Sequence, residues 1–206
     1  MGTIDATAWV ERFLVAAEAH RAQLGDLDRQ AGDGDFGTNL ETSLRRAREE
    51  LSGAGGQAPF AALSTAFLNT GGTSGPLYGM WFRALAQAAD AGPLDARALG
   101  TAVAAGTDAV CRLGGAAVGD KTMVDAMRPA ADALLAASEA GEDVARALAA
   151  AATAARRGAD ATAAMLARRG RSSYVGEVAR GVLDPGAVTV AIFFEAAPGP
   201  DGGAEG

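Results

Sequence analysis

The sequence predicts an all-α protein. Apolar residues recur with helical periodicity in almost every segment, whereas the alternation typical of strands is almost absent. Glycine-rich joints separate these segments, and several helices open on a Thr or Asp that can serve as a cap. With 206 residues the chain is long enough to bury one core. We therefore expect a single domain over residues 1–197 and a disordered tail over residues 198–206.

Four helices are expected in the N-terminal half. An apolar stripe predicts the first over residues 6–24. Thr38 is the expected N-cap of the second, over residues 39–51. The third ends at the glycine-rich break of residues 70–75, and Pro76 suits the first turn of the fourth.

Four more helices are expected in the C-terminal half. The fifth spans roughly residues 95–113. The sixth follows Thr122, and Pro129 should kink it or mark a late start. Asp143 opens an alanine-rich seventh helix that reaches about residue 168. The eighth carries an apolar run over residues 188–194 that could form a strand on propensity alone. Its Asp-Pro start and the lack of partner strands favour a helix.

The composition excludes several classes of protein. A net charge of −7 argues against nucleic-acid binding, which depends on basic residues that neutralise phosphates. No apolar run is long enough for a membrane span, and the N-terminus has no signal-peptide pattern, so we expect a cytoplasmic protein. Cys111 has no partner for a disulfide and is expected to be a small buried residue. Lys121 is the single lysine among 18 basic residues, which suggests a role that arginine cannot fill, although composition bias also explains the scarcity of lysine.

The segment most suited to a metal ion is Gly32-Asp33-Gly34-Asp35-Phe36-Gly37 together with Asp28 upstream. Three carboxylates fall within eight residues, and the interleaved glycines let the backbone bend until all three meet. Oxygen ligands of this kind suit a hard ion such as Mg²⁺. The spacing does not fit an EF-hand, because no Glu stands at the twelfth position. A solvated acidic turn is the alternative for this segment taken alone.

Other glycine-rich joints could bind an anion. The loop of residues 71–75 leads directly into a helix N-terminus, which offers free amides and a favourable dipole. Residues 114–122 approach the spacing of a P-loop, but Asp120 intervenes before Lys121 and no strand precedes the loop, so a P-loop fold is rejected. Residues 170–174 supply Arg171, and residues 184–186 form another tight turn at a helix start.

The order of these motifs closely resembles the L subunit of dihydroxyacetone kinases. The resemblance runs from the first helix to the last and includes the GDGD, GGTSGPLYG, GDKTM and DPGA segments. It implies a closed barrel of eight antiparallel amphipathic helices, with ADP or ATP bound at one end through two Mg²⁺ ions. The implied metal ligands and catalytic residues are Asp28, Asp33 and Asp35. The implied nucleotide-binding residues are Gly37, Thr38, Asn39, Thr73, Ser74, Gly114, Met123, Arg171, Asp184, Pro185 and Gly186.

One residue departs from the family pattern. The family commonly has His where this chain has Phe36, and a phenyl ring cannot hydrogen-bond a phosphate. The single histidine, His20, is expected on the surface of the first helix, so phosphohistidine chemistry within this chain is not expected.

The resemblance also implies partners. A separate K-type subunit would hold dihydroxyacetone covalently on a histidine, while this chain presents the nucleotide. In one branch of the family a phosphohistidine M subunit recharges a permanently bound ADP; in the other, ATP exchanges. Association into a homodimer stays open. The alternatives are a kinase subunit for another short ketose such as a tetrulose, a domain like the nucleotide domain of fatty acid kinases, and a non-catalytic ADP-binding module.

Overall fold

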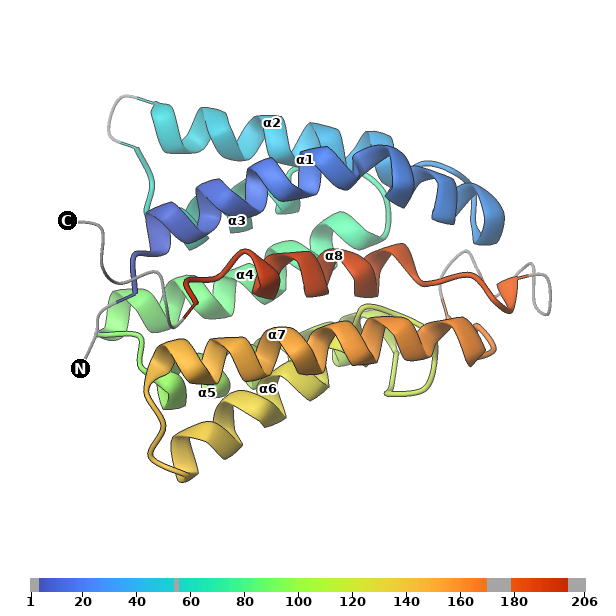
Figure 1. Ribbon diagram of the computed structural model, residues 1–206. Coiled ribbons are helices and arrows are strands. Elements are labelled where there is room, and N and C mark those ends of the chain that lie inside the picture. Colours follow the sequence, from blue (N-terminus) through green and yellow to red (C-terminus); the bar gives the residue numbers. More distant parts are fainter. Residues whose placement is uncertain (1–3, 54–55, 170–178, 200–206) are drawn as a thin grey trace.

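The computed structural model describes residues 4–53, 56–169 and 179–199, and this part of the chain contains helices and no strand (Figure 1). The helices are α1 (Ala6–Ala31), α2 (Phe36–Ser52), α3 (Pro59–Leu68), α4 (Ser74–Ala91), α5 (Ala96–Gly114), α6 (Val124–Glu139), α7 (Val144–Ala161), the short 3₁₀ helix η1 (Thr162–Ala164) and α8 (Pro185–Glu195). The predicted all-α class is confirmed, and so is the helical assignment of the apolar run in α8.

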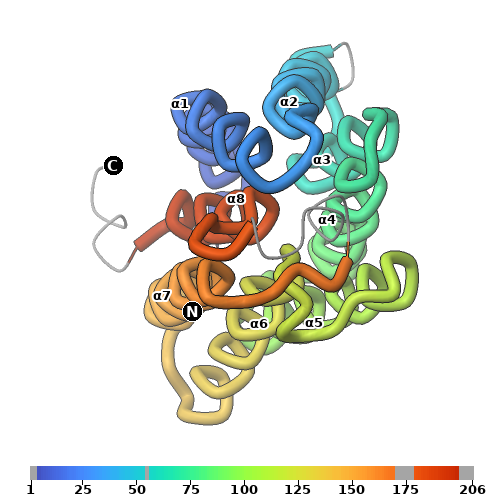
Figure 2. The backbone as a smooth tube through the Cα atoms, turned by 90° about the vertical axis from the view of Figure 1, so that its right-hand side faces the viewer, coloured from blue at the N-terminus to red at the C-terminus, as the bar shows by residue number. Residues whose placement is uncertain are grey.

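The helices form a closed ring in chain order. Each of α1 to α7 packs against the next, and α8 packs against both α7 and α1 (Figure 2). Consecutive helices run antiparallel, and every connection except the one between α7 and α8 is short. The predicted closed barrel of eight helices is therefore confirmed.

Helix α8 differs from the amphipathic pattern expected of all eight. Its residues from Pro185 to Phe194 are all buried, because α6, α7 and α1 surround it. The Phe193 ring stacks on Trp9 at a centroid distance of 4.6 Å and contacts Phe13 edge to face at 5.3 Å. The Trp9 indole also donates a hydrogen bond of 2.7 Å to the Phe193 carbonyl, which ties α8 to α1.

The boundary between α1 and α2 differs from the prediction. Helix α1 continues to Ala31, so Asp28 lies in its last turns and not in a loop. Helix α2 begins at Phe36, and Asp35 occupies its N-cap position without a side-chain capping bond. Thr38 lies inside α2 and is exposed, so its predicted role as N-cap is wrong.

Helix α7 is shorter than predicted and is packed unusually closely on α6. It ends at Ala161, and the 3₁₀ turn η1 follows. Pro129 lies inside α6 and does not delay the start of this helix at Val124. Because proline has no amide hydrogen, the Asp125 carbonyl lacks its usual helical donor. A Cβ atom on Gly158 would lie 2.1 Å from this carbonyl oxygen, so only glycine allows the observed approach of α7.

The remaining local predictions are mostly confirmed. The expected helix starts at Asp143 and Asp184 are confirmed, because each side chain accepts an amide hydrogen bond as the N-cap of α7 or α8, and Asp95 does the same for α5. His20 is exposed, as expected, whereas Cys111 is half-buried and not fully buried. Residues 200–206 of the expected tail lie outside the described residues. None of the described helices has the length and apolar character needed to cross a membrane.

Candidate functional site

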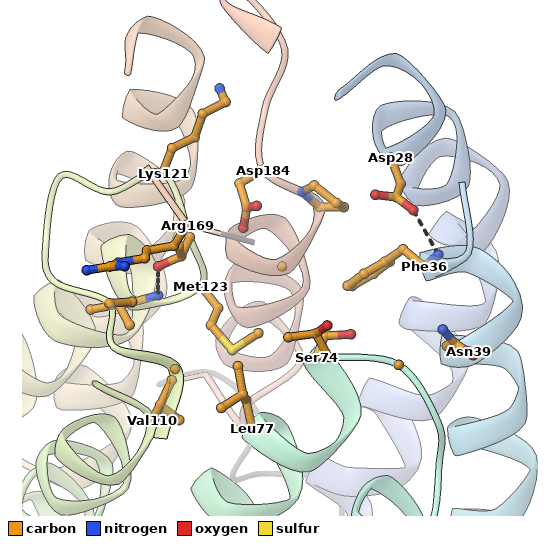
Figure 3. A pocket seen from close by; sticks show the side chains of 18 of the residues that line it. Asp28, Phe36, Asn39, Ser74, Leu77, Val110, Lys121, Met123, Arg169 and Asp184 are labelled. Atoms are coloured by element: carbon orange, nitrogen blue, oxygen red, sulfur yellow. Dashed lines mark hydrogen bonds between the residues drawn. The ribbon is translucent and has the colours of Figure 1, made fainter. Parts of the chain in front are cut away.

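Five segments meet at one end of the barrel and line a pocket. They are the α1–α2 turn, the start of α4, the end of α5 with the loop into α6, residue 169, and the start of α8. In Figure 3, Asp28, Phe36 and Asn39 lie on one side and Val110, Lys121 and Arg169 on the other, with Ser74, Leu77 and Met123 between them. The structure thus brings together these residues of the predicted site: Asp28, Asp33, Asp35, Asn39, Thr73, Ser74, Gly114, Met123, Asp184, Pro185 and Gly186.

Two predicted residues are not part of this lining, and a third is not described. Gly37 is buried where α2 crosses α1, and a Cβ atom added to it would lie 3.2 Å from the Gly25 Cα atom. Its role in the structure is therefore the close approach of two helices. Thr38 is exposed on α2, and its carbonyl accepts the Thr42 hydroxyl. Arg171 lies outside the described residues.

The acidic side of the pocket is organised by Asp28. This carboxylate is buried, and its Oδ2 atom accepts a hydrogen bond of 2.9 Å from the Phe36 amide. Burial raises the pKa of Asp28, and the neighbouring charges of Asp33 and Asp35 raise it further, whereas amide hydrogen bonds from Phe36 and Gly34 oppose the shift. The three carboxylates therefore repel one another, and a bound cation would relieve this repulsion.

The three carboxylates lie too far apart in this structure to coordinate one metal ion together. Within the described residues, no three Asp, Glu, His or Cys side chains are gathered closely enough to hold a metal ion. Asp28, Asp33 and Asp35 nevertheless line the same pocket, and Asp33 and Asp35 are exposed on a short turn that contains glycine. Carboxylate oxygens on such a turn fit Mg²⁺, which takes a few protein ligands and completes its shell with water and phosphate oxygens.

The start of α4 provides the surface best suited to phosphate. Gly72 has a φ angle of +84° and lies against Asn39, whose Nδ2 atom would be 2.6 Å from an added Cβ atom. Thr73 and Ser74 follow at the N-terminus of this 18-residue helix, where free amides and the helix dipole favour an anion. Gly72, Thr73 and Ser74 of the predicted anion loop thus line the same pocket as the acidic turn.

An apolar slot lies deeper between α4 and α5. Leu77, Val110 and Met123 line it, together with Ala116 and Val124 from the loop and the start of α6. An apolar lining of this kind suits a heteroaromatic base. The sequence suggested Met123 and Gly114 for this wall but not Leu77 or Val110, because helical stripe residues cannot be distinguished from core by spacing alone.

The turn at the start of α8 carries an unusual carboxyl group. Asp184 Oδ2 accepts a hydrogen bond of 2.7 Å from the Ala187 amide, and Tyr78 donates one of 2.6 Å to the Gly186 carbonyl. Burial raises the pKa of Asp184 to about 7. The charges of Asp125 and Asp28 also raise this pKa, while the Ala187 hydrogen bond and Lys121 lower it. Burial and the Asp184 charge together raise the pKa of the Tyr78 hydroxyl well above its usual range.

The sequence singled out Lys121 as the only lysine and placed it in a candidate loop, but gave it no individual role in the site. Its exposed fraction is 1%, and its ammonium group donates to the carbonyls of Thr162 and Val182. Burial lowers the pKa of Lys121, and the carboxylates of Asp184 and Asp125 oppose that shift. Gly72, Ala116 and Thr122 also line the pocket and lie in the loops of residues 71–75 and 114–122 that the sequence suggested, whereas Phe36, Leu77, Val110, Val124 and Arg169 were not predicted as site residues.

Comparison with known proteins identifies relatives over nearly the whole chain. The family model described as the DAK2 domain matches residues 30–198. The "PEP-dependent dihydroxyacetone kinase 1, ADP-binding subunit DhaL" of Listeria innocua is 34% identical over 195 residues, which are 93% of each chain. The "L-erythrulose 1-kinase" of Mycolicibacterium smegmatis is 39% identical over 201 residues, which are 92% of this chain but 34% of that protein.

A solved structure supports the same relationship. The dihydroxyacetone kinase of C. freundii superposes with a TM-score of 0.71 at 29% identity, over 93% of this chain and 33% of the other. The same kinase in complex with AMP-PNP and Mg²⁺ gives a TM-score of 0.67. This chain thus spans about a third of the erythrulose kinase and of the C. freundii kinase, but nearly all of the Listeria subunit. The resemblance indicated by the sequence motifs is confirmed.

Proposed function

This chain belongs to the DAK2 domain family, and we propose that it is the nucleotide-binding subunit of a dihydroxyacetone kinase. In this role it binds ADP or ATP and presents a phosphoryl group to dihydroxyacetone held on a separate K-type subunit. One observation supports the proposal most strongly: the carboxylates, the N-terminus of α4 and the apolar slot all line one pocket. A Mg-nucleotide needs these three surfaces for its metal, its phosphates and its base.

Each surface has a distinct task in phosphoryl transfer. Asp28, Asp33 and Asp35 would hold two Mg²⁺ ions, which neutralise the charge that develops on the transferred phosphoryl group. Thr73 and Ser74, together with Asn39 on the carboxylate side, orient the phosphates. Leu77, Val110 and Met123 would hold the base, so that the phosphates lie toward the carboxylates that line the same pocket. Positioning and electrostatics supply most of the catalysis in such reactions.

A second substrate class has its own support. The 39% identity with an L-erythrulose 1-kinase favours a tetrulose as the alternative acceptor. The acceptor would still come from the partner subunit, so the choice between the two ketoses rests with that partner. We also propose that the protein works in the cytoplasm. A phosphohistidine M subunit would recharge bound ADP if this chain functions in the same way as its PEP-dependent relatives.

A reconstituted kinase assay tests this function. The purified chain is combined with a K-type subunit, Mg²⁺, ATP and either dihydroxyacetone or erythrulose, and phosphorylation of the ketose is followed. We expect turnover only when both proteins are present. Replacing ATP with catalytic ADP, a phosphorylated M subunit and phosphoenolpyruvate tests the coenzyme route. A robust rate from the isolated chain would show that the proposed division of labour is wrong.

A further inference from the structure

Lys121 is buried in a strained backbone position beside the pocket. It is the only residue other than glycine with a positive φ angle among the described residues, at +63°. A side chain that carries a Cβ atom is disfavoured there, so the surrounding contacts must hold it. A buried ammonium group is also costly unless its protons are bonded. Two unfavourable features therefore coincide at the single lysine of this chain.

The loop that carries Lys121 is itself held by a buried carboxylate. Asp125 accepts hydrogen bonds from the amides of Gly119 and Thr122, at 2.5 and 2.8 Å, and its exposed fraction is 2%. These bonds lie on either side of Lys121 in the sequence and fix the loop against the start of α6. Met123, at the end of this loop, forms part of the apolar wall.

The Lys121 side chain connects this loop to the segment that leads into α8. In Figure 3 it extends away from Met123 and Ser74, so it does not point at the floor of the pocket. Its ammonium group donates to the carbonyls of Thr162, in η1, and Val182, two residues before Asp184. The Thr162 hydroxyl in turn accepts a hydrogen bond of 2.9 Å from the Asp184 amide. The Lys121 ammonium group thus joins η1 to the segment just before Asp184, and the Thr162 hydroxyl bonds Asp184 directly.

We propose that Lys121 is a positioning residue that holds the turn of Asp184, Pro185 and Gly186 at its working distance from the Met123 wall. The inference rests on the proposed nucleotide-binding function, because the two walls enclose the site of the base and ribose. Met123 and Gly186 are close enough for this to matter: a Cβ atom on Gly186 would lie 3.4 Å from the Met123 Cβ atom. The turn therefore packs directly against Met123, and a small displacement of the turn shifts the Met123 side of the apolar slot.

Arginine is not an equivalent residue at this position. The ammonium group is compact and can direct protons to two carbonyl oxygens from one atom, whereas guanidinium spreads its donors over a rigid plane. The site is almost fully enclosed, so the larger group would displace Thr162 or Val182. This explains why the only lysine of an arginine-rich chain lies here.

The test compares Lys121→Met with the matched control Trp9→Phe. Methionine keeps the apolar stem and removes the donors. The control removes a different buried hydrogen bond to α8, that of the Trp9 indole with the Phe193 carbonyl. Phe193 lies near the C-terminal end of α8, whereas the pocket lies at the N-terminal end of this helix. The melting temperature of each variant is measured. The Kd values for MgADP are then determined by calorimetry at a temperature well below both melting transitions. We expect both variants to melt earlier, but only Lys121→Met to weaken MgADP binding, by about tenfold or more.

Three results would overturn the proposal. One is a Kd of Lys121→Met within about twofold of wild type despite a lower melting temperature, which would make the lysine purely structural. Another is an equal weakening of MgADP binding in Trp9→Phe, which would indicate that any loss of a buried hydrogen bond to α8 weakens binding. If Lys121→Met does not fold, Lys121→Arg is used instead, and an unchanged Kd there would have the same meaning. Absence of MgADP binding by the wild type would contradict the proposed function itself, and the role of Lys121 with it.

Discussion

The Phe36 amide donates a hydrogen bond of 2.9 Å to the Asp28 carboxylate and closes the acidic turn onto the end of α1. The two residues are eight apart in the sequence, and the bond brings the first turn of α2 next to the last turns of α1. The Phe36 ring points from there into the pocket (Figure 3) and packs partly against the core. The same residue therefore anchors a carboxylate, lines the ligand site and contributes to packing.

Phe36→His tests whether a donor at this position improves phosphate binding. We expect MgADP to bind more tightly, by up to about 1.5 kcal/mol or roughly tenfold, at a pH where the imidazole can donate a hydrogen bond. The melting temperature should fall, because the half-buried ring loses apolar contacts. Calorimetric titration and thermal melts measure both effects.

Phe36→Leu is the control for this substitution. Leucine lacks a donor, so it should lower the melting temperature without tightening the binding of MgADP. If Phe36→His is destabilised and its affinity for MgADP is unchanged, the imidazole does not reach the phosphates. The phenyl ring would then be a packing residue only.

The raised pKa of Asp184 predicts a pH dependence of stability. Burial raises this pKa from an ordinary value of 3.8 to about 7. Between these two pKa values the folded protein keeps a proton that the unfolded chain has released. The free energy of unfolding therefore falls as pH rises from about 4 to about 7, and above about 7 the whole of this contribution is lost. In Asp184→Asn the amide oxygen can still accept the Ala187 hydrogen bond but does not titrate. We expect a smaller difference in melting temperature between about pH 6 and about pH 8 in this variant than in wild type.

This comparison is made in EDTA and without nucleotide, so that ligand binding does not contribute. The sign of the effect matters as much as its size. A wild-type protein that becomes more stable over this pH range relative to Asp184→Asn would show that the carboxyl is not held protonated.

Gly158→Ala tests the close contact of α6 and α7. The added Cβ atom would lie 2.1 Å from the Asp125 carbonyl oxygen, so one helix must move. Alanine favours a helix by about 1 kcal/mol, but overpacking outweighs this gain, and we expect a net loss of about 1–3 kcal/mol in the free energy of unfolding. Denaturant unfolding measures it. Gly71→Ala, whose Cβ atom would meet nothing within 4 Å, serves as the control and should change stability by less than about 0.5 kcal/mol. Equal stabilities would mean that the contact is relaxed in solution.

Signals close together in the sequence predicted most of the fold. The capping aspartates Asp95, Asp143 and Asp184 act on amides three residues away, so sequence alone locates these helix starts. The start of α2 was predicted too late, because the Asp28 bond to Phe36 depends on how two helices meet. The contact of Gly37 with Gly25 was not predicted for a similar reason: it lies between helices and leaves no local pattern.

The candidate site was predicted from loops and motifs and therefore lacked two apolar residues from the helices. Leu77 and Val110 occupy positions typical of a core stripe, and only the structure shows that they face the pocket. Lys121 was conspicuous by its rarity, but its carbonyl partners lie about 40 and 60 residues further along the chain. No spacing rule connects such distant positions.

The central claim, that carboxylates at this pocket bind a nucleotide through Mg²⁺, is tested most directly by calorimetric titration of ADP into wild type and Asp33→Asn. The substitution keeps the size of the side chain and removes its charge. Each protein is measured with Mg²⁺ and again with EDTA. We predict that the wild type binds ADP only when Mg²⁺ is present and not in EDTA. We predict that Asp33→Asn does not bind ADP even with Mg²⁺, because the remaining carboxylates cannot bridge the metal to the phosphates. An affinity of Asp33→Asn within about twofold of wild type in Mg²⁺ would contradict the account.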